Sequence, residues 1–204
     1  MIADTTLLAG LGVVISLMAL IVSACTMYFA WLRRGRLAMT KPALVFFGYD
    51  AVPRSIPKIF LRTLLYSTAP QGKMIEGMYV KLRRGDVERT FGFWGYGEAT
   101  KLSPGSGLYV SQAGVAANHH FVLSVHQPHY EFAAGEYIVR VYARQVGEHE
   151  PVLLTEIRLV LDERHAAALS NKSGVLFELE PDTQAYAGHP SERPSDIEGG
   201  GLRE

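Results

Sequence analysis

The sequence contains a single cysteine, Cys25, among its 204 residues. One cysteine cannot form an intrachain disulfide, so a small fold stabilised by disulfides is excluded. An excess of charge of either sign is also absent, because 20 Lys and Arg residues balance 20 Asp and Glu residues. Nucleic-acid-binding proteins usually carry clustered basic charge, and we therefore expect no nucleic acid as a partner.

The motifs that would identify an enzyme are missing too. The glycine-containing stretch 95–101 lacks the third glycine of a dinucleotide fingerprint, and the stretch 103–109 lacks the Gly-Lys-Ser/Thr of a phosphate-binding loop. No Gly-x-Ser-x-Gly elbow is present, and the only cysteine lies in an apolar segment. We therefore predict no enzymatic activity, no catalytic residue and no cofactor.

Charge is absent from one long segment, since no charged residue occurs between Asp4 and Arg33. A helix needs roughly 20 apolar residues to cross a bilayer, so residues 5–32 are predicted to form a single transmembrane helix. Tyr28 and Trp31, near the end of this segment, are residue types enriched at the membrane interface. A cleaved signal peptide would carry positive charge before a shorter apolar run.

Positive charge follows the apolar segment instead of preceding it. The positive-inside rule then places the N-terminal segment 1–4 outside the cell membrane, whether plasma or inner membrane, and the C-terminal domain in the cytoplasm. The basic residues form a juxtamembrane linker over 33–41, before the first acidic residue at Asp50: Arg33, Arg34, Arg36 and Lys41.

An exported location is the alternative. The Val-Ser-Ala-Cys sequence that ends at Cys25 resembles a bacterial lipobox, which would imply a lipidated, envelope-facing protein. The missing basic residues before the apolar run, and the apolar residues that continue to Leu32, argue against export.

Small residues recur along the predicted span at spacings of four and three. Such a period of about 3.5 residues places them on one helix face, and close approach at small residues drives helix association in lipid. We expect self-association, or pairing with another protein's helix, through this seam: Thr5, Ala9, Gly12, Ser16, Ala19, Ser23, Thr26 and Ala30.

Residues 42–180 alternate between apolar and polar side chains, which predicts strands with one buried face. Turn residues separate the strands at intervals of about a dozen residues, as in an antiparallel sandwich or barrel. Asp162 can cap a short helix over 163–170, and the Pro- and Gly-rich segment 181–204 is predicted to be a disordered tail. The expected strands cover 58–67, 78–84, 90–97, 107–112, 119–126, 136–144, 152–161 and 174–180.

The stretch AGEYIVRVYA, residues 134–143, resembles the penultimate strand of immunoglobulin-like and fibronectin-like domains. In that family a tyrosine near the start of the strand bonds back across a corner, a role that falls to Tyr137 here. The resemblance implies an all-β antiparallel sandwich, with one short helix and a preceding transmembrane helix. It carries no functional implication.

Four of the seven histidines lie within residues 118–129, which makes this segment a candidate metal site. His119 and His120 should point to opposite faces of a strand, with His120 on the more polar face. His120 and His126 lie roughly 20 Å apart along a strand, too far to share one zinc ion. Only His126 and His129 could converge across a turn, with Glu131 as an additional candidate ligand. A metal-dependent enzyme that uses His126 and His129 is the weakest alternative.

The aromatic stretch 90–97 supplies a candidate contact surface. Alternation places Trp94 and Tyr96 on one face, and Phe91 and Phe93 on the other, which we expect to be the core. Exposed aromatic side chains anchor partners well. We therefore expect a membrane-anchored, non-enzymatic binding or scaffold module in a membrane-associated assembly. Its expected partners are the lipid bilayer and a protein, and the alternative is an envelope-facing ligand-binding module.

Overall fold

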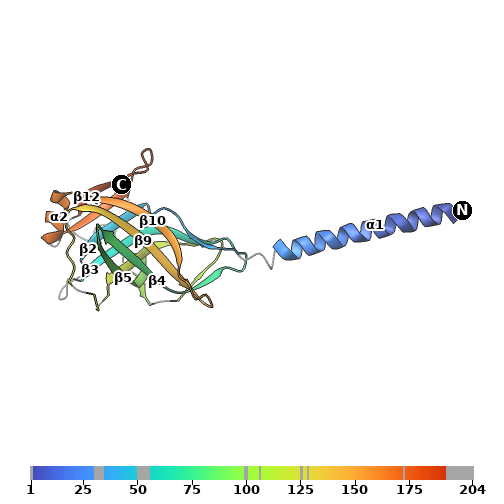
Figure 1. The fold of residues 1–204 in the computed structure, drawn as a ribbon, viewed down its shortest axis with the longest axis horizontal. Coiled ribbons are helices and arrows are strands. Elements are labelled where there is room, and N and C mark those ends of the chain that lie inside the picture. The colour runs from blue at the N-terminus through green and yellow to red at the C-terminus, as the bar shows by residue number, and fades with distance from the viewer. Residues whose placement is uncertain are drawn as a thin grey trace.

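The structure is a computed structural model that describes residues 2–29, 35–49, 56–98, 101–105, 107–124, 126–127, 129–171 and 173–191. An N-terminal helix precedes a β-rich body, and a second, short helix lies near the C-terminus (Figure 1). The elements are α1 (Ile2–Met27), β1 (Leu37–Met39), β2 (Leu44–Tyr49), β3 (Pro57–Ser67), β4 (Lys73–Arg84), β5 (Val87–Glu98), β6 (Lys101–Pro104), β7 (Leu108–Val110), β8 (Val115–Leu123), β9 (Gly135–Gln145), β10 (Val152–Leu161), α2 (Glu163–Ser170), β11 (Gly174–Leu179) and β12 (Tyr186–Ser191).

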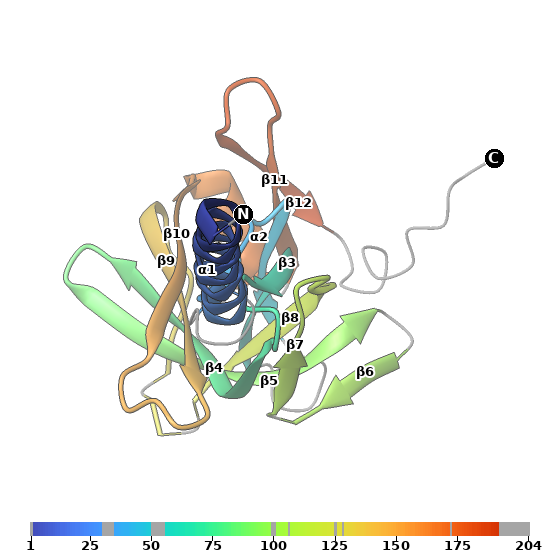
Figure 2. The ribbon, with the colours of Figure 1, turned by 90° about the vertical axis from the view of Figure 1, so that its right-hand side faces the viewer.

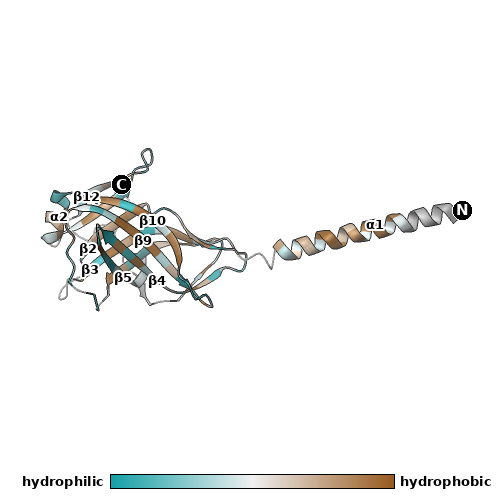
Figure 3. Cartoon of the chain, in the orientation of Figure 1, coloured by the Kyte–Doolittle hydropathy of each residue, from teal (hydrophilic) through white to brown (hydrophobic). Residues whose placement is uncertain are grey.

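Helix α1 overlaps the predicted span 5–32 and projects away from the body. Its stretch Gly10–Met27 is uncharged and mostly apolar, with a mean hydropathy of 2.2, and none of it is buried against the rest of the chain (Figure 3). By length and composition this helix can cross a membrane, a requirement that an N-terminal signal sequence also meets.

The strands form one antiparallel sheet that curls around a common core. The order of its main path is β10-β9-β4-β5-β8-β3-β2-β11-β12, while β1 pairs with β3, β6 with β5, and β7 with β4. The first strand of this path, β10, also contacts β12 and β1, so the sheet nearly closes into a barrel (Figure 2). The side chains that point inward form the main hydrophobic core.

The predicted antiparallel β-rich domain is therefore confirmed, but the finer prediction of an immunoglobulin-like sandwich is not. A sandwich has two separate sheets packed face to face, whereas here hydrogen bonding continues from β10 to β12 through one sheet. The corner bond is nevertheless present, because the Tyr137 hydroxyl donates to the Ala133 carbonyl at 2.6 Å. A local motif of this kind does not determine how the strands are shared between sheets.

Helix α2 lies against β11 and β12, at the end of the body away from α1. Its N-cap is Asp162, as predicted, whose Oδ1 accepts a hydrogen bond from the His165 backbone N–H at 2.7 Å. Ala166 and Leu169 are buried and join the main core.

Two short strands lie outside the predicted β-domain 42–180. Strand β1 lies within the predicted linker 33–41, and β12 lies within the predicted disordered tail 181–204. Both short strands form by pairing with distant partners: β1 with β3, and β12 with β11. Their own composition does not favour strand, so only the tertiary partner explains them.

Candidate functional site

The two aromatic residues predicted to share a contact surface lie on opposite faces of the sheet. The register between β5 and β8 shifts between Phe93 and Gly95, which leaves Trp94 as the extra residue of a β-bulge. One extra residue reverses the alternation that follows it. Tyr96 therefore pairs with His119 and stacks on Phe93, with ring centroids 6.4 Å apart.

Trp94 keeps an exposed position on the outer face, with 41% of its surface accessible. The Lys58 ammonium lies 5.8 Å from the centre of its ring, a cation–π geometry that restrains the indole. The surface predicted from Trp94 and Tyr96 therefore reduces to Trp94 alone.

The histidine pair is buried on both faces of β8. His119 points into the interior beside Phe93, while His120 packs on the outer face against Phe60, with ring centroids 5.3 Å apart. The prediction that His120 lies on a polar face is wrong, because Phe46 stacks on Phe60 and the three rings form a second apolar cluster. Among the described residues, no hydrogen-bond partner reaches either nitrogen of either ring.

Burial sets the charge of these two histidines. Desolvation lowers the pKa of His119 to about 4. Desolvation, with the nearby charge of Lys58, lowers the pKa of His120 to about 3. Both rings are therefore neutral core residues at pH 7. Because their charged forms are disfavoured in the core, the fold loses stability at acidic pH.

The candidate metal ligands His126, His129 and Glu131 make only one contact with each other among the described residues. His129 Nε2 lies 3.2 Å from Glu131 Oε1, and His126 is exposed. Within the described ranges, no three His, Cys, Asp or Glu side chains are grouped so as to hold a metal ion.

A surface that the sequence did not single out crosses β10, β9, β4 and β5 on the outside of the sheet. Tyr142 lies opposite Leu153 on one side and Tyr79 on the other, and Tyr79 lies opposite Gly92. The two tyrosine rings stack, with centroids 5.1 Å apart and planes 10° apart. We call this row the tyrosine surface: Tyr79, Gly92, Tyr142 and Leu153.

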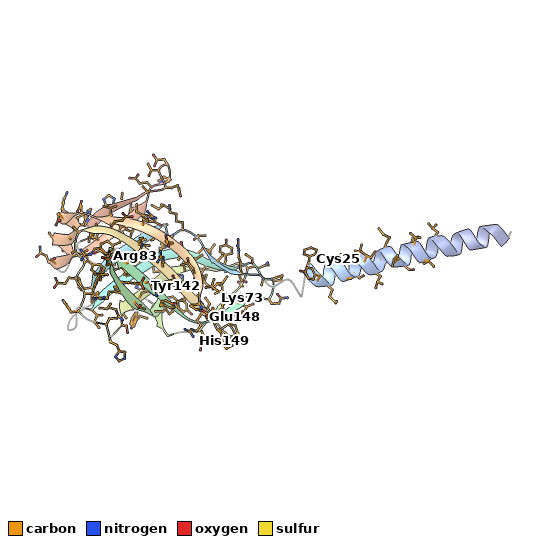
Figure 4. All side chains as sticks on the ribbon, in the orientation of Figure 1. Cys25, Lys73, Arg83, Tyr142, Glu148 and His149 are labelled. Atoms are coloured by element: carbon orange, nitrogen blue, oxygen red, sulfur yellow. The ribbon has the colours of Figure 1, made fainter. Side chains whose placement is uncertain are left out.

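Open space surrounds the tyrosine surface. Leu153 is 47% exposed, and a side chain at Gly92 would meet no atom within 4 Å. On the side of the surface nearer α1, a bulge in β4 creates a hollow of about 420 Å³ lined by Glu76, Gly77, Met78, Tyr79 and Arg144. Figure 4 shows Tyr142, and with it the tyrosine surface, in the middle of the β-rich body.

A row of charged residues borders the tyrosine surface on its other side, with two neighbouring cations in the middle and an acid at each end. The Lys81 ammonium lies 2.9 Å from Glu88, and Arg140 Nε donates to Glu156 at 2.6 Å. The hydrogen bond from Arg140 lowers the pKa of Glu156, and the bond to Glu88 raises the pKa of Lys81. Because Lys81 and Arg140 are cross-strand neighbours, each acid offsets a repulsion between two cations.

The predicted helix seam lies on a helix without a packing partner in this single chain. Gly12, Ser16, Ala19, Ser23 and Thr26 are exposed. The Ser16 hydroxyl donates to the Gly12 carbonyl at 2.9 Å, and the Thr26 hydroxyl to the Val22 carbonyl at 2.8 Å. These hydroxyls are therefore satisfied within the helix, and any association has to rest on close packing. The side chains of Thr5 and Ala9, and residue Ala30, lie outside the described part.

Only two of the four predicted juxtamembrane residues, Arg36 and Lys41, lie in the described part of the chain. Arg33 and Arg34 lie outside the described residues. The Arg36 backbone N–H donates to the Thr68 hydroxyl at 2.8 Å. Lys41 is held by the body, because its ammonium donates to the Gln184 carbonyl and lies 5.5 Å from the centre of the Tyr186 ring.

These contacts describe an outer surface with a stacked aromatic pair, open space and a fixed charged border. No protein-family model matches this chain, and no curated protein matches it.

Proposed function

We propose that the chain is a single-pass membrane protein whose β-rich body binds a partner protein through the tyrosine surface. The observation that carries this proposal is the stacked Tyr79–Tyr142 pair, which lies half-buried on an outer face beside the exposed Leu153. Aromatic side chains on rigid strands supply apolar contact area and lose little rotamer entropy on binding.

Three features adapt this face to a protein partner. Gly92 leaves room for an incoming side chain next to Tyr79. The hollow beside Arg144 and Glu76 provides one group of each charge for polar contacts at the edge. The charged row from Glu88 to Glu156 forms a polar border along one side of the apolar centre, and protein interfaces usually combine an apolar centre with a polar border.

Anchoring by α1 completes the proposal. The apolar helix is long enough to span a bilayer, and the basic residues that follow it favour a cytoplasmic body. A domain fixed to a membrane meets other membrane-bound partners at a raised local concentration, so a surface of modest area is sufficient for binding.

Site-specific crosslinking in cells tests the tyrosine surface. A photoreactive amino acid at Leu153 should crosslink a partner, and the same amino acid at Val160 is the matched control, since Val160 is exposed on the same strand. The double variant Tyr79→Ala, Tyr142→Ala should remove the adduct formed at position 153 while the β-sheet circular dichroism persists. An adduct that is unchanged in this variant would contradict the proposal.

Reporter fusions at the C-terminus test the membrane topology. Fluorescence from a cytoplasm-active reporter, without activity of an export-dependent phosphatase, supports the proposed orientation. The opposite result places the body outside the cytoplasm and favours the alternative of an envelope-facing module that begins at the lipobox-like Cys25.

A further inference from the structure

Three exposed apolar side chains lie together at one end of the body. Met74, Tyr109 and Val146 are 60%, 56% and 59% exposed. Met74 and Tyr109 are cross-strand partners in β4 and β7, and the Val146 backbone N–H donates to the Met74 carbonyl at 3.0 Å. We call this cluster the apolar rim.

The apolar rim lies at the end of the body where the chain arrives from α1. The Tyr109 hydroxyl donates to the Gln71 carbonyl at 2.9 Å, which ties β7 to the turn between β3 and β4. The same turn contains Thr68, whose backbone N–H donates to the Arg36 carbonyl at 2.9 Å. Figure 4 shows Lys73, the neighbour of Met74, at the end of the body that faces the helix.

Chain length keeps this end close to α1. The last described residue of the helical segment is Phe29, and Gly35 is the first described residue of the body. The six residue steps between them span at most about 20 Å when fully extended. A helix that crosses a membrane therefore holds the apolar rim near the bilayer surface.

We propose that the apolar rim docks on the bilayer surface and inserts its side chains at the interface. This inference rests on the proposed anchoring by α1. Tyr109 is a residue type that favours the interface. Lys73 precedes Met74 in β4, and the Arg36 backbone is hydrogen-bonded to Thr68 in the turn before β4, so two basic residues belong to the same end of the body. Glu148 and Glu150 follow Val146 in the same hairpin, so charge attraction alone is a weak explanation of docking. Apolar insertion is the dominant contribution.

Lipid-dependent quenching tests the docking. In the full chain with Cys25→Ser, single cysteines at Met74, Val146 or Val160 are labelled with an environment-sensitive fluorophore. The protein is placed in nanodiscs that hold one copy each and contain phosphatidylcholine with a nitroxide on the acyl chain near the headgroup. Val160 is the matched control because it is 69% exposed but lies near the end of β10, away from α1.

Interfacial apolar groups lie about 5–10 Å deep, at the boundary of headgroups and acyl chains, so we expect about threefold more quenching at 74 and 146 than at 160. The difference should persist in 1 M salt, where the Debye length is only about 3 Å. Equal quenching at all three positions would overturn the docking, as would a loss of the difference in high salt. Shielding of the fluorophores at 74 and 146 only in nanodiscs that hold two copies would overturn docking on the bilayer. It would show that a second copy of the chain covers the apolar rim.

A fourth label separates failure of the docking from failure of the anchor. A cysteine at Val14, in the middle of α1, should be quenched by a nitroxide deep in the acyl chains. Quenching at 14 without quenching at 74 and 146 rejects the docking alone, and absence of quenching at 14 rejects the membrane anchor on which it rests.

Discussion

Lowering the pH from 7 to 5 is expected to destabilise the body through His119 and His120. Both side chains are fully buried, and their pKa values in the folded state are about 4 and about 3. In the unfolded chain a histidine titrates near pH 6.5. Below this value the unfolded state binds more protons than the folded state, so the free energy of unfolding falls with the pH. The loss levels off below about pH 4 for His119 and below about pH 3 for His120.

The size of the effect follows from the interval between pH 6.5 and pH 5. A difference of about 1.5 pH units at about 1.4 kcal/mol each gives about 2 kcal/mol per histidine. The double variant His119→Leu, His120→Phe replaces both rings with apolar side chains suited to their neighbours, Leu61 and Phe60. Its free energy of unfolding should fall by about 4 kcal/mol less than that of the parent between pH 7 and pH 5.

Urea denaturation in mild detergent measures this difference. Trp94 fluorescence can report unfolding in a Trp31→Phe background, since the chain has two tryptophans. The variant His126→Asn is the matched control, because His126 is exposed, and it should follow the parent. If the double variant loses as much stability as the parent over this pH range, the assignment of two neutral buried histidines is refuted.

Three further predictions concern the corner, the short helix and the seam. Tyr137→Phe removes the hydroxyl that donates to a backbone carbonyl and should lower the free energy of unfolding by about 1 kcal/mol, measured by urea titration. Tyr142→Phe, on the outer face, should have no comparable effect. Asp162→Ala removes the N-cap of α2 and should destabilise by about 1 kcal/mol in the same assay. Replacing Gly12 and Ser16 with Ile should abolish self-association in a membrane two-hybrid assay, and an unchanged signal would exclude the seam.

Alternation predicted the inward faces of the strands well where pairing is regular. In β9 every second residue is buried, as alternation requires, from Tyr137 through Val139 and Val141 to Ala143. The period of two is a local property of an extended backbone, so it can be read without knowledge of the neighbouring strand.

The prediction failed where the outcome depends on a partner. Trp94 forms a bulge because β5 pairs with β8 both before and after this one extra residue. The bulge reverses the alternation, so Tyr96 lies on the inner face. His120 is buried because Phe60 and Phe46 pack beside it on the outer face, and an alternating pattern cannot show that both faces are covered.

The tyrosine surface was missed for the same reason. Alternation along β4 is enough to place Tyr79 on the outer face, but its stacking on Tyr142 requires the register between β4 and β9. Residues 85–134 separate those two strands in the sequence, and no local signal specifies which residues will lie opposite each other.

The position of β11 in the sheet has a consequence for biosynthesis. Strand β2 lies between β3 and β11, and Val45 pairs with Phe177 near the C-terminal end of the body. During translation, one edge of β2 therefore stays unpaired until β11 has left the ribosome, long after α1 has emerged. A nascent or truncated chain that stops before β11 exposes an apolar strand edge, which is a template for aggregation. The sheet can therefore be completed only after β11 has been synthesised, when α1 has already been available for targeting.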